Sequence, residues 1–339
     1  LSLYATRSLD PITFVNAFDT KLTMLDNQCV MASSGTALDP AAQAAPPEDG
    51  GDARSFMLHE GSGSGSVPGD DVLVREIGGR VDIRPVTHPD RKPPQRNVGK
   101  AWYHFKRYIK DKEQTNEVVA VFDNLPWREL HDEAAAFLQT DRGREIYRAE
   151  PYLPTFLDDH EALRCTPKGS FAHAYCDFME REGLTAAGMV EATKAREDAN
   201  YFDDGVNWYI ERLRDFHDIL HIVTGYGRDI LGEQCIFAYM YHQRPSPGHL
   251  YLAWIGALMV RAQALRSRAP IIGALREARR NGKGCPRIVE QPIQELFALP
   301  LEEVRARFNT PAPHVYHKVM DIFREEGIDP HAFLAKQED

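Results

Sequence analysis

The chain has 339 residues, of which 43% are hydrophobic and 27% are charged, and its formal net charge is -10 at pH 7. This composition is typical of a globular protein with a sizeable core. The negative charge argues against a general nucleic-acid binder, because phosphate contacts need clustered cations. The five cysteines are odd in number and form no C-x-x-C pair, so a reducing compartment fits better than a disulfide framework.

The first 95 residues are expected to be a largely disordered or weakly structured N-terminal segment. Residues 36–71 are poor in large apolar side chains and rich in Gly, Ala, Pro, Ser and Asp, so they cannot bury enough surface to offset the entropy of ordering. Residues 72–95 have room for one short hairpin, and Pro93 and Pro94 mark a boundary. We see no secretory signal at the start and no apolar run of the roughly 20 residues that a membrane-spanning helix needs.

From residue 96 to residue 339, apolar residues recur at helical spacing. The predicted fold is therefore mostly α, a single bundle-like domain of many helices that follows a flexible N-terminal segment. We expect helices around Trp102–Ile109, Trp127–Leu138, Phe171–Glu182, Gly205–Thr224, Leu250–Arg268, Pro270–Arg280, Pro292–Leu299, Leu301–Phe308 and Val315–Glu326.

The helical pattern is strongest over Gly205–Thr224. Its expected core stripe is Val206, Ile210, Leu213, Leu220 and Thr224. His217 and His221 fall within the same stripe. The glycines at 225 and 227 end this helix, and a second helix from about Asp229 carries Glu233 on its first turns. A short loop between two helices makes them antiparallel neighbours, which would bring Glu233 to His221.

His217, Asp218, His221 and Glu233 form the most informative pattern of the chain, H-D-x-x-H followed by eleven residues and E. Residues four apart lie about 40° apart around a helix, so the two histidines project from one face. Asp218 lies about 100° from His217 and about 60° from His221, so these three can close on one ion. Polar groups that face a core are costly unless they are paired. A shared divalent cation would pair them, and so would a histidine–carboxylate hydrogen-bond network, and the spacing leaves both interpretations open.

Comparison with known metal sites shows which kinds of site the H-D-x-x-H pattern disfavours. Zinc proteases use the Glu of H-E-x-x-H as general base, whereas here the shorter Asp218 takes that place, which disfavours a peptidase. Di-iron bundles need two Glu-x-x-His sets, and the neighbouring helices carry none, so a single-metal site is preferred. Zinc, manganese and iron all accept mixed histidine and carboxylate ligands. His314 and His317 have no acid beside them, and we interpret them as an ordinary surface or packed pair.

Further segments around the H-D-x-x-H string carry a resemblance to a known family. They are T-D-R-G-R-E-I (Thr140–Ile146), P-K-G-S-F-A-H-A-Y-C-D-F (Pro167–Phe178), Y-I-E-R-L-R-D-F-H-D-I-L-H (Tyr209–His221), L-G-E (Leu231–Glu233), R-N-G-K-G-C-P (Arg280–Pro286) and L-E-E-V-R-A-R-F-N-T-P-A-P (Leu301–Pro313). With these segments the chain resembles the ubiquinone (coenzyme Q) biosynthesis proteins of the Coq-four family over roughly Gly99–His317. The metal string is specific, whereas each flanking segment alone is weak.

The resemblance implies an all-α metal- and lipid-binding domain over residues 96–339, with one divalent metal ion on His217, Asp218, His221 and Glu233. Zinc is the first expectation, with magnesium, manganese or iron as alternatives. The resemblance also implies oxidative decarboxylation of a polyprenylated 4-hydroxybenzoate-type head group, in which a hydroxyl replaces the C1 carboxylate. No separate catalytic residue is predicted, because the ligands would act through the ion. A non-catalytic lipid-binding scaffold that organises ubiquinone-biosynthesis enzymes, or a metal-dependent hydrolase, are the alternatives.

The expected partners are the polyprenylated ubiquinone precursor, the other ubiquinone-biosynthesis enzymes and a membrane surface, with no nucleic acid. A homodimer is an expectation from the family alone. We expect a cytoplasmic protein that is peripheral on the inner face of the membrane, or on the matrix face of the mitochondrion in a eukaryote. The apolar stretch Leu250–Val260 precedes a basic segment, which anionic headgroups would attract at roughly 1 kcal/mol per cation. Arg261, the first of these cations, is a candidate for substrate binding.

Overall fold

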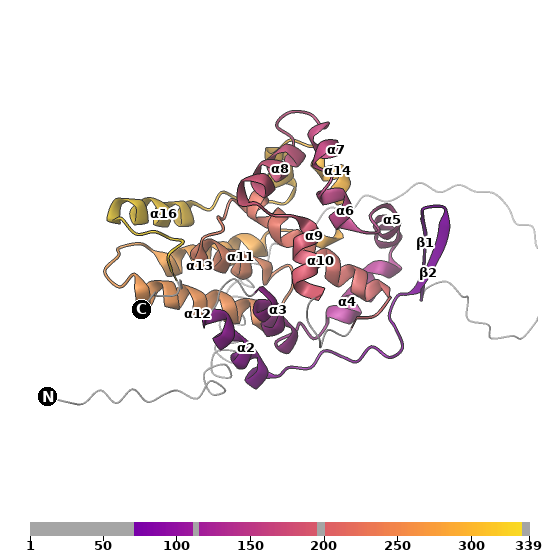
Figure 1. Ribbon diagram of the computed structural model, residues 1–339, viewed down its shortest axis with the longest axis horizontal. Coiled ribbons are helices and arrows are strands. Elements are labelled where there is room, and N and C mark those ends of the chain that lie inside the picture. Colours follow the sequence, from indigo (N-terminus) through magenta and orange to yellow (C-terminus); the bar gives the residue numbers. More distant parts are fainter. Residues whose placement is uncertain (1–70, 111–114, 195–200, 334–339) are drawn as a thin grey trace, which may run out of the picture. The chain divides into compact units, whose positions relative to one another are not determined.

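The computed structural model describes residues 71–110, 115–194 and 201–333, and for these residues the predicted mostly α-helical fold is confirmed (Figure 1). The helices are α2 (Val98–Lys110), α3 (Thr115–Asn124), α4 (Leu130–Gln139), α5 (Asp141–Ala149), α6 (Leu153–Leu157), α7 (His160–Arg164), α8 (Phe171–Glu182), α9 (Ala186–Lys194), α10 (Gly205–Thr224), α11 (Ile230–Met240), α12 (Pro247–Gln263), α13 (Ile271–Lys283), α14 (Ile293–Phe297), α15 (Leu301–Arg307) and α16 (His314–Glu326). A short 3-10 helix, η1, spans Ile288–Glu290, and the two strands are β1 (Val72–Ile77) and β2 (Arg80–Pro85). The expected disorder of the N-terminal segment falls largely on residues 1–70, which lie outside the described residues.

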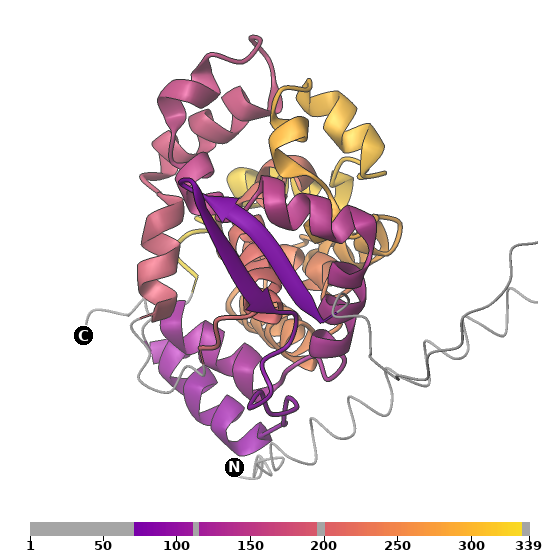
Figure 2. The same ribbon diagram turned by 90° about the vertical axis from the view of Figure 1, so that its right-hand side faces the viewer.

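The two strands form a β-hairpin, which confirms the hairpin predicted within residues 72–95. Its two-residue turn is Gly78-Gly79, whose φ angles of 58° and 76° favour glycine. Leu73 on β1 is buried, and the guanidinium of Arg75 donates a 3.2 Å hydrogen bond to the carbonyl of Pro151. The hairpin therefore packs against the helices, with β1 next to α5 (Figure 2).

Helix α10 runs through the middle of the helical part and covers the range that the sequence predicted (Figure 1). The side chain of Asp204 accepts a hydrogen bond from the backbone N–H of Asn207 at its start, and Gly225, with a φ of 78°, ends it. From Asp215 to Thr224 every residue except His217 is buried. A helix that is buried nearly all round needs neighbours on several sides, and α4, α8, α11 and α15 supply them.

A buried ion pair fixes the first half of α10. The side chains of Arg212 and Glu150 are each 1% exposed, with Nη1 2.5 Å from Oε2. The same guanidinium donates hydrogen bonds of 2.7 and 2.5 Å to the carbonyls of Val289 and Gln291. Because a buried charge that loses its partner is strongly destabilising, this arginine ties α10 firmly to the end of α5 and to η1.

Helix α11 carries Glu233 and packs mainly against α12 and α13. Asp229 caps its start by accepting backbone N–H groups of the first turn, and the Tyr316 hydroxyl of α16 donates to the same carboxylate. A Cβ atom on Gly256 of α12 would lie 2.3 Å from the amide of Gln234 on α11, so the glycine leaves room for this amide between the two helices. These contacts set the position of the turn that holds Glu233.

Five helices lie where the sequence predicted none, namely α3, α5, α6, α7 and α9. Helices α6 and α7 have five residues each, which is too short for a periodic pattern to be recognised. Helix α3 packs against α2 and α12, and its last turns line the cavity that adjoins α10. Of the helices in the described ranges, none combines the length and the apolar character needed to cross a lipid bilayer.

Candidate metal centre and its cavity

Three of the four predicted ligands meet near the end of α10. His217 and His221 lie one helical turn apart, with their Nε2 atoms at 3.4 Å. Glu233 reaches both from the first turn of α11. Its Oε2 atom is 3.3 Å from Nε2 of His217, and its Oε1 atom is 3.5 Å from Nε2 of His221. In this triad, which consists of His217, His221 and Glu233, each oxygen of the carboxylate thus faces one of the two imidazoles.

Hydrogen bonding orients His221 with its Nε2 atom toward the triad. Its Nδ1–H donates to the carbonyl of Tyr226, 3.0 Å away, in the turn after α10. Since a carbonyl can only accept, the proton of the neutral ring is on Nδ1 and the lone pair is on Nε2. The Phe178 ring of α8 stacks on this imidazole with centroids 5.8 Å apart. Histidines that bind metals are ordinarily held in this way by a partner on the second ring nitrogen.

The spacing of the ligand atoms in the triad is close to that around a single metal ion. Bonds of about 2.0–2.1 Å from a metal to nitrogen or oxygen, at tetrahedral angles, place the donor atoms about 3.3–3.4 Å apart. The two Nε2 atoms, 3.4 Å apart, match this value. One oxygen of Glu233 lies 3.3 Å from His217 and the other lies 3.5 Å from His221, so each oxygen has such a spacing to one histidine. Two imidazoles and one carboxylate with an open fourth position are also the ligand set of one class of catalytic zinc sites. The residues present therefore fit a divalent cation.

The charges of the triad depend on one another. Burial raises the pKa of Glu233, but His221 and His217 outweigh burial and hold that pKa below its ordinary value. Burial lowers the pKa of His221, but Glu233 outweighs it and raises that pKa. The His221 side chain is fully buried, and that of Glu233 is 19% exposed. A carboxylate that faces two imidazole lone pairs needs a positive charge between them, which protons or a metal ion can supply.

Asp218, the fourth predicted ligand, lies beside the triad. It is buried and lines the same cavity. The ligand atoms of the triad all lie within 4.8 Å of one another, and Asp218 is not a member of that group. Its carboxylate contributes to the raised pKa of His221, so it acts on the triad through its charge. A direct bond from Asp218 to the ion stays a prediction.

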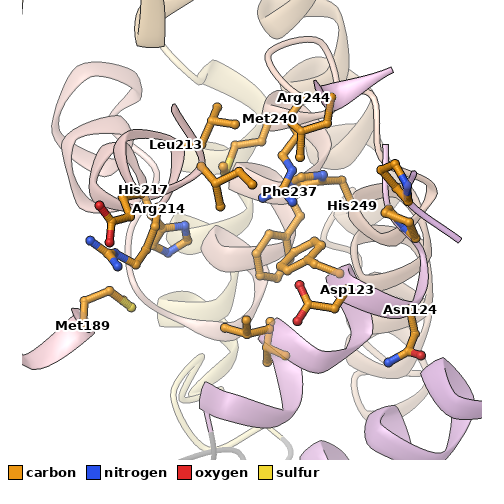
Figure 3. A pocket seen from close by; sticks show the side chains of 18 of the residues that line it. Asp123, Asn124, Met189, Leu213, Arg214, His217, Phe237, Met240, Arg244 and His249 are labelled. Carbon is orange, nitrogen blue, oxygen red and sulfur yellow. The ribbon is translucent and has the colours of Figure 1, made fainter. Parts of the chain in front are cut away.

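A cavity of about 1450 Å³ adjoins the triad (Figure 3). One stripe of α10 faces it, formed by Asn207, Ile210, Arg214 and His217. Ile210 was expected in the core stripe, but it is only half-buried and faces the cavity. The cavity takes the place of packed neighbours there. Leu213, Phe237 and Met240 add an apolar wall. Small-molecule pockets commonly measure about 300–1,000 Å³, so this cavity has room for a long ligand.

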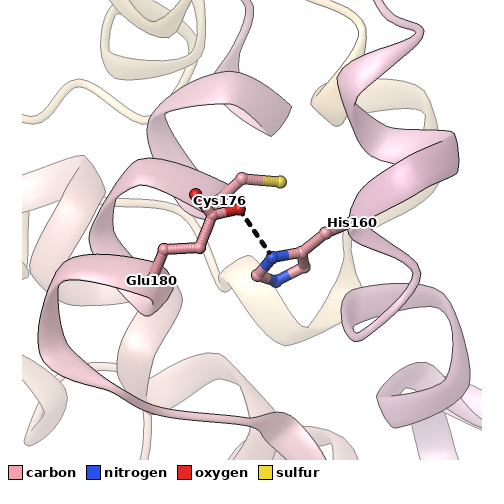
Figure 4. A group of neighbouring side chains, drawn as sticks. All are labelled: His160, Cys176 and Glu180. Carbon is pink, nitrogen blue, oxygen red and sulfur yellow. Dashed lines mark hydrogen bonds and ion pairs between the residues drawn. The ribbon is translucent and has the colours of Figure 1, made fainter.

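A second group of potential ligands lies between α7 and α8, formed by His160, Cys176 and Glu180 (Figure 4). Their ligand atoms also lie within 4.8 Å of one another. However, Oε1 of Glu180 is 3.0 Å from Nδ1 of His160, and the Arg164 guanidinium donates to Oε2 at 2.9 Å. Burial raises the pKa of the Cys176 thiol and so favours the protonated form, which is a poor metal ligand. This group is therefore less suited to a cation than the triad.

The remaining predicted residues lie away from the cavity. His314 and His317 are both exposed on α16, as an ordinary surface pair would be. Arg261 lies at the end of α12, where its guanidinium donates a 2.9 Å hydrogen bond to the Ala264 carbonyl, and it is not one of the described residues that line the cavity. Its role in substrate binding stays a prediction.

Two polar residues of the cavity wall were missed by the sequence analysis. Arg244 lies in the turn between α11 and α12, and His249 lies in the first turn of α12. Side chains in a turn follow no period, so no hydrophobic pattern points to them. The only available signal was the string R-P-S-P-G-H, in which two prolines fix the backbone beside the arginine.

The fold and the site together define a mostly α-helical protein with a triad able to hold a metal ion at the wall of a large, partly apolar cavity. The family model described as "Coenzyme Q (ubiquinone) biosynthesis protein Coq4" matches residues 107–313, which is more than half of the chain. The chain belongs to this family, and the resemblance inferred from its motifs is confirmed.

Individual relatives carry the same family name. A Culex quinquefasciatus protein named "Ubiquinone biosynthesis protein COQ4 homolog 2, mitochondrial" is 32% identical over 100 residues, which are 29% of this chain and 42% of that protein. The Bos taurus homologue is 26% identical over 172 residues, 50% of this chain and 62% of that protein. The Penicillium rubens homologue is 24% identical over 194 residues, 56% of this chain and 64% of that protein. The chain thus spans less than two thirds of the length of each of these relatives.

Proposed function

We propose that this protein acts in ubiquinone biosynthesis as a metal-dependent oxidative decarboxylase of a polyprenylated 4-hydroxybenzoate-type head group. Membership in the Coq4 family supports the pathway. The observation that carries the reaction is the convergence of the His217 and His221 imidazoles and the Glu233 carboxylate, with N–O and N–N distances of 3.3–3.5 Å, beside a cavity that two of these residues line. A head group that enters the cavity would reach the open fourth position of the triad.

The reaction replaces the C1 carboxylate of the ring with a hydroxyl. Its balance is ArCO2⁻ + H2O → ArOH + CO2 + H⁺ + 2e⁻, so an oxidant must accept two electrons. The sequence carries no flavin or nicotinamide fingerprint, and we assign the electrons to dioxygen or to a partner protein. A divalent cation would act as a Lewis acid on the carboxylate as charge moves into the ring.

The residues of the chain have separable tasks in this proposal. The triad would hold the cation, with the Tyr226 carbonyl fixing the His221 ring for that purpose. Leu213, Phe237 and Met240 would bury part of the isoprenoid tail. Asp218 would add negative charge close to the cation. Zinc is the first expectation for the metal, with magnesium, manganese and iron as alternatives.

The second candidate function is a lipid-binding scaffold that organises the other ubiquinone-biosynthesis enzymes without catalysis. The size of the cavity favours it, because about 1450 Å³ would hold a prenylated lipid whether or not the lipid reacts. In that case the metal would only grip the head group.

We also propose that the protein contacts a membrane surface near the end of α12. Leu258 and Leu265 are 45% and 71% exposed, and Arg266, which follows Leu265 in the chain, is exposed as well. Exposed apolar side chains next to cations are attracted to anionic lipid surfaces. The relatives named mitochondrial support a mitochondrial location, and within the mitochondrion we expect the matrix face.

Purified protein would decide between these functions. Elemental analysis and mass spectrometry of co-purified lipid come first, followed by assay of a short-tailed prenylated 4-hydroxybenzoate with each divalent metal. We expect CO2 release and a hydroxylated product from the wild type and neither from Glu233→Ala, which should still fold and bind the lipid. Binding without conversion under every metal and oxidant would favour the scaffold, and release of a phosphate or acyl product would indicate a hydrolase. Metal-free, lipid-free protein of full stability would refute both main proposals.

A further inference from the structure

Arg244 presents a cation to the cavity with little to balance its charge. Its Nε atom is buried and has no hydrogen-bond partner among the residues that the structure describes. The Asp123 carboxylate acts on it only over a distance, while burial lowers its pKa. Arg244 as a whole is half-buried, and a partly buried guanidinium without a bonded counterion is still costly, so an anion from outside the chain would stabilise it.

The backbone on both sides of Arg244 is held in place. The side chain of Gln243 donates to the Pro286 carbonyl at 3.1 Å and accepts from the backbone N–H of Ile288 at 2.8 Å. On the other side, the hydroxyl of Ser246 donates to the Leu125 carbonyl at 2.5 Å. The guanidinium is therefore offered from a braced turn, which is what a preorganised binding residue requires.

His249 lies beside Arg244 and also lacks a partner. It is 1% exposed, and its Nδ1 atom makes no hydrogen bond within the described ranges. Its pKa is held well below the ordinary value by burial and by the charges of Arg244 and His217. Figure 3 shows Arg244, His249 and Phe237 on the same cavity. Two unsatisfied polar side chains thus face one region of it.

Aromatic side chains line the cavity between this region and the triad. The Phe237 ring lies 6.1 Å from the His217 ring and 6.4 Å from the His249 ring, centroid to centroid. Phe122 of α3 packs against both Phe237, at 5.5 Å, and His249, at 4.5 Å. A flat aromatic ligand could stack along these rings with one polar end at the triad and the other at Arg244.

We propose that Arg244 and His249 form an anion-binding subsite that holds a second oxygen-bearing end of an aromatic acid, opposite the end that meets the triad. The identity of the aromatic acid rests on the proposed function, whereas the charge argument does not. A guanidinium offers a planar fork of donors that fits a carboxylate, or a phenolate as a single acceptor. The subsite would fix the head group before any chemistry takes place.

Calorimetric titration of chelator-treated full-length protein tests the subsite without the metal. The probes are geranylated 4-hydroxybenzoate, its neutral carboxamide and its 4-methoxy ether. Arg244→Gln should weaken binding of the carboxylate probe by about 10- to 100-fold, because that is the loss of affinity expected when a hydrogen bond to a charged group is removed. If the carboxylate is the bound anion, the carboxamide should be nearly insensitive to the substitution. If the ring hydroxyl is bound, the methoxy ether should be the insensitive probe.

Controls separate charge from packing. Arg142 is not among the described residues that line the cavity and pairs with Glu145 at 2.8 Å, so Arg142→Gln should leave every affinity unchanged. Arg244→Lys should keep part of the anion preference, and thermal melting should show that each variant is folded. Equal weakening of all three probes, no weakening at all, or no measurable binding to the wild type would overturn the subsite. Conversion assays with metal test the proposed function separately. If the substrate is converted but its binding does not depend on Arg244, only the subsite is refuted. If binding depends on Arg244 but no substrate is converted, only the decarboxylase is refuted.

Discussion

The triad on α10 and α11 and the group on α7 and α8 contain similar side chains in different settings. In both, three potential ligand atoms lie within 4.8 Å of one another. In the triad, His221 is fully buried and the carboxylate oxygens of Glu233 face the two imidazoles. In the other group, Glu180 is 53% exposed and is shared between His160 and Arg164. Proximity of ligand types is therefore not what distinguishes a metal site.

The difference lies in how each carboxylate is neutralised. Glu180 has the permanent positive charge of Arg164 within 2.9 Å, so a cation would have to compete with it. Among the residues that the structure describes, Glu233 forms ion pairs only with imidazoles, whose charge depends on protons that a metal can replace. The triad also has the cavity on one side and the Tyr226 carbonyl behind His221. The predictions below test this contrast.

Removal of a ligand from the triad should have the largest effect. Each of His217→Ala and Glu233→Ala deletes one of three donors. Metal affinity should then fall by more than about 100-fold, because loss of a supporting residue alone costs about 10- to 100-fold. His160→Ala and Glu180→Ala should retain the metal content of the wild type. Elemental analysis after dialysis against one zinc buffer measures all four variants, and similar losses in both pairs would remove the contrast.

Metal removal should affect stability only through the triad. A ligand that binds only the native state adds about 2.7 kcal/mol when its concentration is a hundred times its Kd. Wild type and His160→Ala should therefore lose about that amount when a chelator replaces zinc, and Glu233→Ala should lose almost nothing. Chemical denaturation with and without zinc gives the free energy of unfolding. A wild type that is indifferent to zinc would argue that the triad is a polar network without a metal.

A glycine substitution should weaken the triad while leaving all its ligands in place. Gly225 has a φ of 78°, where an alanine costs about 1–2 kcal/mol, and its Cβ would lie 3.5 Å from Pro313. Relaxation of that strain would move the Tyr226 carbonyl away from His221, so Gly225→Ala should lower zinc affinity by about 10-fold.

Gly183→Ala is the matched control for this substitution. Gly183 ends α8 with a φ of 65° and has open space around its Cβ position, so the backbone cost is similar and the triad is untouched. Competition of each variant with a chromogenic chelator measures zinc affinity. A drop of the same size in both variants would show that general strain, and not the position of the carbonyl, is responsible.

The sequence was most informative where local rules act without help from distant segments. Helix α10 was predicted with its observed bounds because a strong apolar stripe ends at Gly225, which takes the left-handed conformation. The pairing of His217 with His221 follows from helical spacing alone. To predict that Glu233 approaches the histidines, the short loop between α10 and α11 had to be considered as well.

The sequence was least informative where a side chain gains its role from packing between distant segments. Arg244 and His249 face the cavity only because α3, α10 and α11 surround it, and no pattern near residues 244–249 shows this. The position of Asp218 has a similar cause. Helical spacing places Asp218 near the histidines, and Glu233, which enters from α11, completes the close group of ligand atoms; a direct bond from Asp218 to the ion stays a prediction.

The smallest expected effect concerns Arg164, the residue that distinguishes the α7–α8 group from the triad. Its side chain and those of Asp177 and Glu180 are 34%, 64% and 53% exposed. Exposed ion pairs contribute about 0–1 kcal/mol, so Arg164→Gln should lower the free energy of unfolding by less than about 1 kcal/mol. Its informative effect is on metal binding, because Glu180 then loses its permanent counterion.

We expect Arg164→Gln in a Glu233→Ala background to bind zinc weakly, and the same protein with Cys176→Ser to bind less. Equilibrium dialysis against zinc measures both, with the triad inactive in each. Zinc uptake that depends on Cys176 would show that Arg164 is what keeps the α7–α8 group free of metal. If no zinc is taken up, burial of the Cys176 thiol is the stronger barrier, since a thiol must lose its proton to bind the ion. The two groups would then differ because the Cys176 thiol keeps its proton, and not because Arg164 competes with the metal ion for Glu180.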